Sequence, residues 1–347
     1  MSALAERRSK SKVLSTAGLA VTTEPRVAKQ PQCIGALRGK KKIIVATEEG
    51  FARAYKLTGK VVDSTHPGMN VSFATDLKND KEVVIKSLDR SASFVHQPSE
   101  ERQWRATMEV QLNLPKMDTL CQIYDVIETK KAYYVIMEKV AGLDLFELMS
   151  EENLGVKDVR EIVLLILKAV KELHCRGRIH KDLKLENVMV NSGSPPGSPG
   201  RVKLIDFDTV QPWESNSPRQ RIVLGTDCYI APEAYDGEYS PASDIYCIGV
   251  IMYHLLTGKF PTNLNIFDGL QRENVVGSAT MKRTKARLLE ERIDFRRPPL
   301  DRIPKAADLV RKMLAFDPHE RFSCDECLKH AWFETEEDLR LEPPKKT

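Results

Sequence analysis

Apolar positions in the first part of the chain form short runs separated by turn residues, which is the pattern of β-strands. Such runs fill residues 55–88, and the β-branched run at 83–85 predicts a strand. Two more strands are expected over residues 121–126 and 132–137. Residues 99–114 show helical spacing, with Ser99 as a candidate N-cap. The first part is therefore predicted to be a sheet with one main helix.

Helical periodicity dominates the second part of the chain. Residues 159–173 carry apolar side chains at the i, i+3, i+4, i+7 spacing of a buried helix face. Gly177 is placed to end that helix. Residues 243–257 predict another strongly apolar helix, which Gly258 closes and Pro261 follows.

These patterns divide the chain into a sheet-rich part, residues 46–138, and a mostly helical part, residues 139–335. Residues 1–45 lack sustained periodicity and are predicted to be a disordered tail, and residues 336–347 a polar C-terminal tail. A Ser/Pro/Gly-rich stretch at 191–200 predicts a loop that projects from a hairpin. The predicted fold class is α+β with two lobes, which suits a chain of 347 residues.

The charge is distributed unevenly along the chain. The net charge is +4, from 53 Lys and Arg against 49 Asp and Glu. Residues 1–42 hold ten Lys/Arg and two Glu, a balance of +8, so the remainder carries 43 basic and 47 acidic residues, a balance of −4. The basic arm predicts a solvated tail, with binding to an anionic membrane or nucleic acid as the alternative. Its acidic residue at position 6 and the lack of an amphipathic helix argue against a transit peptide.

Several classes of protein do not fit this composition. No run approaches the ~20 apolar residues that a membrane span needs, so no transmembrane segment is expected. Seven cysteines without a framework pattern suit reduced thiols and a cytoplasmic location, with a nuclear location as the alternative. Cys324, Cys327 and His330 could be read as metal ligands, but a second ligand pair is missing and an amphipathic helix is the preferred interpretation.

The strongest chemical pattern lies in residues 179–190. There Asp182, Lys184 and Asn187 fall in one tight loop between apolar flanks. A carboxylate can accept a hydroxyl proton, an ammonium can neutralise a phosphoryl group and an amide oxygen can hold magnesium. This loop therefore carries the groups that phosphoryl transfer needs.

Four further blocks accompany the loop in a fixed order. They are the strand-like residues 83–86 ending in Lys86, Asp206-Phe207-Asp208, residues 225–229 and Ala231-Pro232-Glu233. Together they resemble the eukaryotic protein kinase family over residues 52–335, and the loop and residues 225–226 resemble its serine/threonine members. The block at 317–333 is similar to the calcium/calmodulin-dependent group, although no calcium loop is present. The resemblance implies a bilobal kinase fold that uses ATP and Mg2+.

The resemblance also implies roles for individual residues. Asp182 corresponds to the catalytic base, Lys184 to the group that steadies the γ-phosphate, and Thr226 completes the catalytic set. Asn187 and Asp206 correspond to the magnesium ligands. The implied nucleotide-binding residues are Val62, Val71, Lys86, Glu109, Glu138, Val140 and Met189.

Other implied roles concern partners of these groups. Glu109 is expected to pair with Lys86, with Glu101 as the alternative. Glu138 and Val140 are expected to offer backbone groups to adenine, behind which Met137 stands. Structural roles are implied for Asp244, which caps the catalytic-loop backbone, and for an ion pair between Glu233 and Arg321.

Three positions depart from the family pattern. The segment that should be glycine-rich, residues 62–74, contains only Gly68, so phosphate cover would fall to Ser64 and Thr65. Asp208 replaces a glycine and adds charge beside the metal site. Lys181 replaces an arginine, keeping the charge but losing the bidentate fork, which weakens any switching by a phosphate on Ser215 or Ser217.

The function predicted from the sequence is a serine/threonine protein kinase acting in signalling. Asp144 and Glu186 are placed to receive basic residues of a protein substrate, or else form a solvated acidic rim. A pseudokinase scaffold is the alternative, because of the poor glycine loop and Asp208. A third hypothesis is an adaptor whose basic arm binds a membrane or nucleic acid.

Overall fold

The fold is described from a computed structural model, which covers residues 41–62, 68–94, 98–114, 116–191, 193–267 and 274–334. Residues 1–40 of the predicted tail at 1–45, the predicted tail at 336–347, Ser64 and Thr65 lie outside these ranges. The whole loop at 179–190 lies within them.

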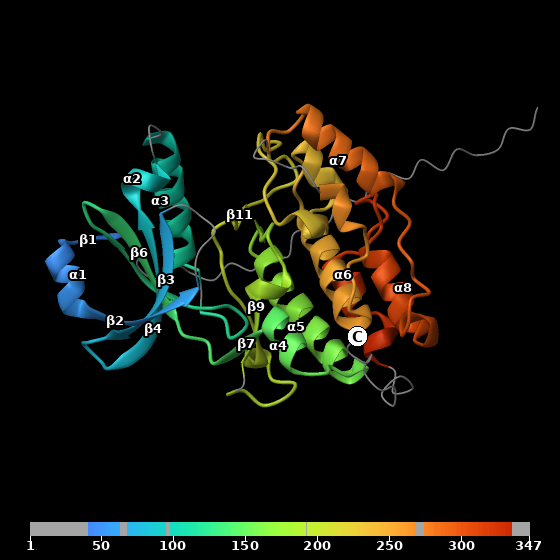
Figure 1. The fold of residues 1–347 in the computed structure, drawn as a ribbon, viewed down its shortest axis with the longest axis horizontal. Helices are drawn as coiled ribbons and strands as arrows, with labels where there is room; N and C mark the ends of the chain where they lie inside the picture. Colours follow the sequence, from blue (N-terminus) through green and yellow to red (C-terminus); the bar gives the residue numbers. More distant parts are fainter. Residues whose placement is uncertain are drawn as a thin grey trace, which may run out of the picture. The chain divides into compact units, whose positions relative to one another are not determined.

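A six-stranded sheet forms the first lobe (Figure 1). The strand order is β1-β5-β6-β4-β3-β2, and every neighbouring pair is antiparallel except β1 with β5. The strands are β1 (Ile44–Val45), β2 (Tyr55–Val62), β3 (Met69–Asp76), β4 (Lys81–Asp89), β5 (Ile123–Glu128) and β6 (Ala132–Glu138). The helices of this lobe are α1 (Glu48–Ala54), α2 (Arg90–Ser93) and α3 (Pro98–Leu112).

The sheet differs from the expected pattern in three details. β1 lies just before the expected lobe boundary at residue 46 and pairs with β5. α3 begins at Pro98, so Ser99 lies inside its first turn and is not the cap. β5 starts two residues late because the backbone of Cys121 instead donates to the carbonyl of Leu204 in the second lobe, at 2.9 Å.

Helices dominate the second lobe, as predicted (Figure 1). Its α-helices are α4 (Leu145–Glu151), α5 (Val156–His174), α6 (Pro241–Thr257), α7 (Ala279–Glu290), α8 (Pro304–Met313) and α9 (Cys324–Leu328). Its short strands are β7 (Gly142–Asp144), β8 (Arg178–Ile179), β9 (Val188–Asn191), β10 (Val202–Leu204) and β11 (Gln211–Pro212). The stretch at 191–200 connects the antiparallel strands β9 and β10.

The core of the second lobe is built around α5 and α6. The six apolar positions predicted for α5 are all buried, and Gly177 follows the helix at a φ of 63°. Ser240 caps α6, and Gly258 ends it at a φ of 67°. Gly249 lets α8 approach α6, because an added Cβ would lie 2.9 Å from Met313 and Leu314. These two helices provide the rigid base from which the catalytic loop projects.

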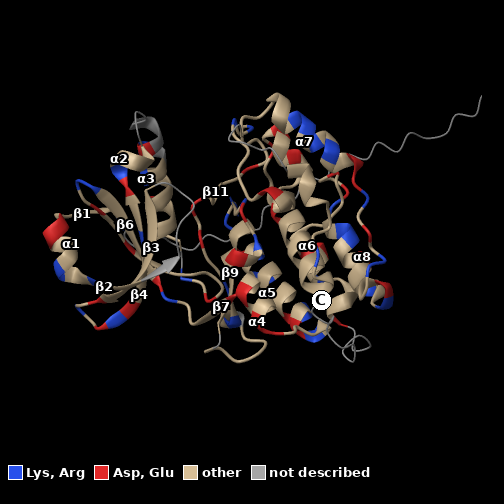
Figure 2. Cartoon of the chain, viewed as in Figure 1, with Lys and Arg blue, Asp and Glu red and all other residues tan. Residues whose placement is uncertain are grey.

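Other features of this lobe concern its surface and its cysteines. Basic side chains line α7 (Figure 2). Cys324 and Cys327 lie on α9 and are buried, and the Cys324 thiol donates to the carbonyl of Leu167. His330 contacts Asp308 instead. Within the described ranges no group of three or more His, Cys, Asp or Glu residues suited to a metal ion occurs.

Candidate active site

The loop at 180–187 is held by a buried carboxylate on α6. Asp244 is fully buried and accepts hydrogen bonds from the backbone N–H groups of His180 and Lys181, each at 2.9 Å. The ring of His174 contacts the same carboxylate at 2.9 Å. These bonds fix Lys181 in a left-handed conformation with a φ of 72°. The predicted capping role of Asp244 is confirmed.

Three predicted site residues, Thr226, Lys184 and Asn187, meet around Asp182. Its Oδ1 accepts a hydrogen bond from the Thr226 hydroxyl at 2.9 Å, and Lys184 Nζ donates to that hydroxyl at 3.1 Å. Lys184 Nζ lies 3.7 Å from Asp182 Oδ2. The side-chain amide of Asn187 donates to the Asp182 carbonyl at 2.8 Å. One carboxylate thus has an ammonium, a hydroxyl and an amide beside it.

A second cluster joins the two lobes. Lys86 on β4 places Nζ 3.0 Å from Asp206 Oδ1 and 2.5 Å from Asp208 Oδ2. Burial opposes ionisation of both partners, but the charge of Lys86 outweighs it and lowers the pKa of Asp206. The two carboxylates likewise raise the pKa of Lys86 despite its burial. The backbone N–H of Ile205 donates to the Asn187 carbonyl at 2.9 Å, which ties this cluster to the catalytic loop.

The structure shows how Asp208 can replace a glycine. Asp206, with a φ of 59°, has the left-handed backbone, and Asp208 is not among the described non-glycine residues with positive φ. Asp208 therefore does not carry the backbone cost that a positive φ imposes on a residue other than glycine. What sequence reasoning missed is its direct contact with Lys86. The available signal was an acid two residues after Asp206, the predicted magnesium ligand.

The glutamates of α3 that were expected to pair with Lys86 do not contact it among the described residues. Among the described residues, neither Glu109 nor Glu101 forms an ion pair with Lys86. Glu101 instead binds Arg90 and the Tyr133 hydroxyl. The α3 residue that reaches the Asp206–Asp208 segment is Gln111, whose amide donates to the Phe207 carbonyl.

The predicted nucleotide-binding residues lie on strands β2, β3, β4, β6 and β9, on α3 and just after β6. Val62, Val71 and Lys86 are paired in register across β2, β3 and β4. Directly opposite residues of neighbouring strands lie on one face of a sheet, so Val71 and Lys86 share a face. Met189 lies on β9, opposite Lys203. The implied roles of these residues remain predictions.

Glu138 is the last residue of β6, the last strand of the first lobe, and Val140 follows that strand. The Glu138 carboxylate binds Lys203 Nζ at 2.7 Å, and its N–H donates to the Gln122 carbonyl at 2.8 Å. Val140 is buried. Recognition of adenine by their backbone groups stays a prediction.

Gly68 is the one described glycine of the phosphate-loop segment. Its φ is 77°, and a Cβ there would lie 2.6 Å from the Ala92 side chain. Its carbonyl accepts from the Asp89 N–H at 2.7 Å. Gly68 therefore serves the turn into β3 through its conformation and small size.

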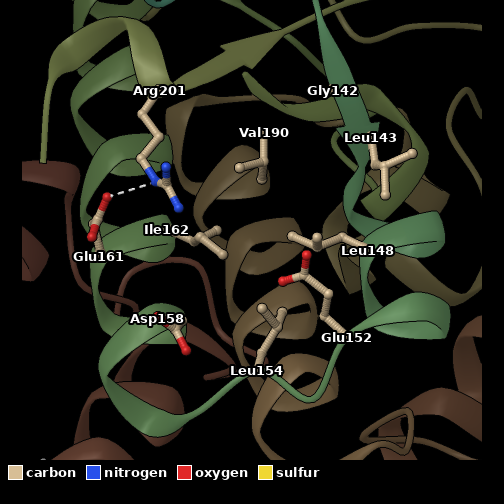
Figure 3. Close-up of a pocket in the computed structure, with 10 residues that line it drawn as sticks. All are labelled: Gly142, Leu143, Leu148, Glu152, Leu154, Asp158, Glu161, Ile162, Val190 and Arg201. Carbon is tan, nitrogen blue, oxygen red and sulfur yellow. Dashed lines mark ion pairs between the residues drawn. The ribbon is translucent and has the colours of Figure 1, made fainter. Parts of the chain in front are cut away.

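A separate cavity of about 320 Å³ lies on the second lobe (Figure 3). Its walls come from β7, α4, α5 and β9, with an Arg201–Glu161 ion pair at 3.0 Å on one side. No predicted catalytic residue lines it. The candidate chemistry is confined to the clusters around Asp182 and Lys86.

Magnesium and ATP fit the residues present. Asn187 directs its amide nitrogen to Asp182, which leaves the amide oxygen for a metal, and Asp206 adds a carboxylate oxygen. Oxygen ligands of this kind suit Mg2+. Lys86 is a buried cation that could bind phosphate oxygens.

Comparison with known proteins agrees with this arrangement. Residues 69–333 match the family described as protein kinase domain. The chain is 30% identical over 237 residues to calcium-dependent protein kinase 24 of Arabidopsis thaliana, covering 67% of this chain and 37% of the relative. It is 32% identical over 246 residues to calcium-dependent protein kinase 22 of Arabidopsis thaliana, which covers 69% of this chain and 47% of the relative. It is 29% identical over 266 residues to calcium-dependent protein kinase 7 of Oryza sativa subsp. japonica, which covers 75% of this chain and 45% of the relative.

The chain spans less than half the length of these relatives. The helices of the described part include none long and apolar enough to cross a membrane. The matched domain, the bilobal α+β fold and the relatives agree with the motifs around Asp182. The chain belongs to the protein kinase family, in the serine/threonine group that includes the calcium-dependent kinases.

Proposed function

We propose that this chain transfers the γ-phosphoryl group of ATP to serine or threonine hydroxyls of protein substrates. The observation that carries the proposal is the convergence of Lys184, Asn187 and Thr226 on Asp182. Phosphoryl transfer needs positioning and charge neutralisation more than covalent chemistry, and these groups supply both.

Each group has a distinct task in this mechanism. Asp182 orients the substrate hydroxyl and accepts its proton, while Thr226 and Asn187 hold the carboxylate in place. Lys184 offsets negative charge on the group being transferred. Asn187 and Asp206 would hold magnesium, and Lys86 would hold the α- and β-phosphates. Bound Mg2+ and ATP supply the phosphoryl group and neutralise its charge.

The test compares acceptor residues and metal. Matched peptides that differ only in Ser, Thr or Tyr are incubated with radiolabelled ATP, with Mg2+ or with excess EDTA. We expect label on Ser and Thr peptides only, and only with Mg2+. Label on Tyr alone, transfer in EDTA, or no transfer to any peptide would contradict the proposal.

We also propose a preference for basic substrates. Asp144 caps α4 through a 2.8 Å bond from the Glu147 N–H. Burial and the nearby charges of Glu147 and Glu186 raise the pKa of Asp144, so the acids lie close together. Glu186 is exposed. Replacing arginine by alanine before the phosphorylated serine should raise the peptide KM for wild type and change it less for Glu186→Gln; equal effects would refute the preference.

The cytoplasmic location, with a nuclear alternative, and the basic arm remain proposals. The arm holds a balance of +8 over residues 1–42 and could bind anionic lipid or nucleic acid. Fluorescent fusions of the full chain and of a chain lacking residues 1–42 test both. If the chain lacking residues 1–42 has the same location as the full chain and binds anionic vesicles and RNA equally well, the arm has no role in either.

A further inference from the structure

Lys86 is a buried cation that depends on neighbouring carboxylates. Its side chain is 12% exposed, and its Nζ contacts Asp206 and Asp208. A buried ammonium is costly unless it is paired and hydrogen bonded. Asp206 is also the predicted magnesium ligand, so a second carboxylate is needed to hold Lys86 once Asp206 is shared.

The described side chains of α3 do not provide that carboxylate in this structure. Glu109 is partly buried, and its contact in the described part is through its carbonyl, which accepts from Asn113 Nδ2. The side chains that the described part of α3 buries are Met108, Gln111 and Leu112, at 1%, 3% and 4% exposure. A thioether, an amide and a hydrocarbon side chain cannot neutralise an ammonium. Gln111 instead fixes the backbone of Phe207.

Asp208, on the segment that also carries Asp206, supplies a second carboxylate to Lys86. Its Oδ2 lies 2.5 Å from Nζ, the shorter of the two contacts. Its backbone is held on both sides, because Gln111 binds the Phe207 carbonyl and the Thr209 hydroxyl donates to the His180 carbonyl at 2.7 Å. Because these bonds fix the backbone around Asp208, its carboxylate is pre-organised for the contact with Lys86 Nζ.

We propose that Asp208 is the positioning residue for Lys86, supplying from the Asp206–Asp208 segment the carboxylate that α3 does not supply. The inference rests on the proposed function, in which Lys86 binds nucleotide phosphates. The orientation of Lys86 then depends on the segment that carries the metal ligand, and not on the placement of α3.

The test is a double-mutant cycle on nucleotide affinity, which needs no catalysis. Calorimetry measures ADP binding in excess EDTA, so that magnesium cannot mediate the effect. The variants are Asp208→Asn, Glu109→Gln and the exposed control Asp118→Asn, each alone and combined with Lys86→Met. A parallel assay of peptide phosphorylation reports the proposed function separately.

We expect Asp208→Asn to weaken ADP binding about tenfold in wild type, the loss of one charge-assisted contact, and to have no further effect with Lys86→Met. Glu109→Gln and Asp118→Asn should show no coupling to Lys86. Coupling of Glu109 but not Asp208, or an equal loss from Asp208→Asn in both backgrounds, would overturn the assignment. ADP binding without peptide phosphorylation in wild type would instead reject the proposed function and leave the coupling measurable.

Discussion

The hydroxyl of Thr226 is a small group with two partners in the catalytic cluster. It donates to Asp182 Oδ1 and accepts from Lys184 Nζ. It therefore orients the Asp182 carboxylate and keeps Lys184 near it, with Nζ 3.7 Å from Asp182 Oδ2. The family resemblance placed Thr226 in the predicted catalytic set, but it could not predict these two hydrogen bonds.

Removing this hydroxyl should slow the reaction while leaving substrate binding nearly intact. We expect Thr226→Ala to lower kcat about tenfold, the equivalent of one hydrogen bond, with a smaller change in KM for ATP. Thr226→Ser keeps the hydroxyl and should retain most of the activity. Steady-state kinetics measure both, and equal losses for the two variants would contradict the role of the hydroxyl.

Lys181 is buried without the arginine fork that the family pattern has at its position. Nζ donates to Gln211 Oε1 at 2.8 Å and lies 5.4 Å from the centre of the Tyr239 ring. Burial lowers the pKa of Lys181 to about 8, although Asp244 opposes the shift. In this structure an amide and a ring surround the cation.

This burial predicts a pH-dependent stability. Below pH 8 the lysine is charged in both states and its burial cost is fully present. Between pH 8 and about 10.5 the unfolded chain binds more protons, so stability rises with pH. From pH 7 to pH 10 the unfolding free energy of wild type should gain roughly 2 kcal/mol relative to Lys181→Met. Denaturant titrations at each pH measure this difference, and a flat or falling difference would contradict it.

At the scale of elements, the predictions succeeded where the pattern was long and periodic. α5, α6, β4 and β6 follow from apolar spacing and closing glycines. α1 was missed because its seven residues are too few for a periodic signal, although Thr47 followed by two glutamates is a capping pattern. It is stabilised by tertiary packing, since the Phe51 ring stacks on Tyr134 at 3.7 Å.

The predicted pair of Glu233 with Arg321 is confirmed and joins distant elements. Arg321 Nη1 and Nη2 bind the two carboxylate oxygens of Glu233 at 2.7 and 3.0 Å. The Ser243 hydroxyl also donates to Glu233, at 2.9 Å. The guanidinium is fully buried. The pair therefore ties the segment before α6 to the segment before α9.

Breaking this pair should leave an uncompensated buried charge. We expect Arg321→Ala to lower the free energy of unfolding by about 3–5 kcal/mol. Arg219→Ala, which removes an exposed ion pair with Glu238, should cost less than about 1 kcal/mol. Denaturant unfolding measures both. Similar small losses for the two variants would show that the buried pair does not stabilise the fold.

At the scale of the whole molecule, the site is assembled from both lobes. Lys86 and Asp206 are separated by 120 residues and lie 3.0 Å apart. Motif order could predict that these two residues share a site, because the family resemblance carries that information. It could not predict that Asp208 and Gln111 also contact this region, since the first contact depends on the conformation of the Asp206–Asp208 segment and the second on how α3 packs.

Nucleotide binding should therefore stabilise the molecule as a whole. ADP with Mg2+ at about 100 times its Kd should raise the Tm by roughly 5 °C, because ligand binds only the folded state. Lys86→Met should reduce this shift, and Asp118→Asn should not. Differential scanning fluorimetry measures the shift in Tm. Equal shifts for Lys86→Met and wild type would show that Lys86 does not contribute to nucleotide binding.

The central claim is that Asp182 is the base of a phosphoryl transfer reaction. The most direct measurement is the rate at which radiolabelled γ-phosphate of ATP appears on an arginine-containing serine peptide, for wild type and Asp182→Asn. Both proteins are first shown to bind ATP with Mg2+ equally. We predict transfer by wild type and a loss of about 10²-fold or more in the variant. No transfer by wild type, or equal rates for the two proteins, would contradict the claim.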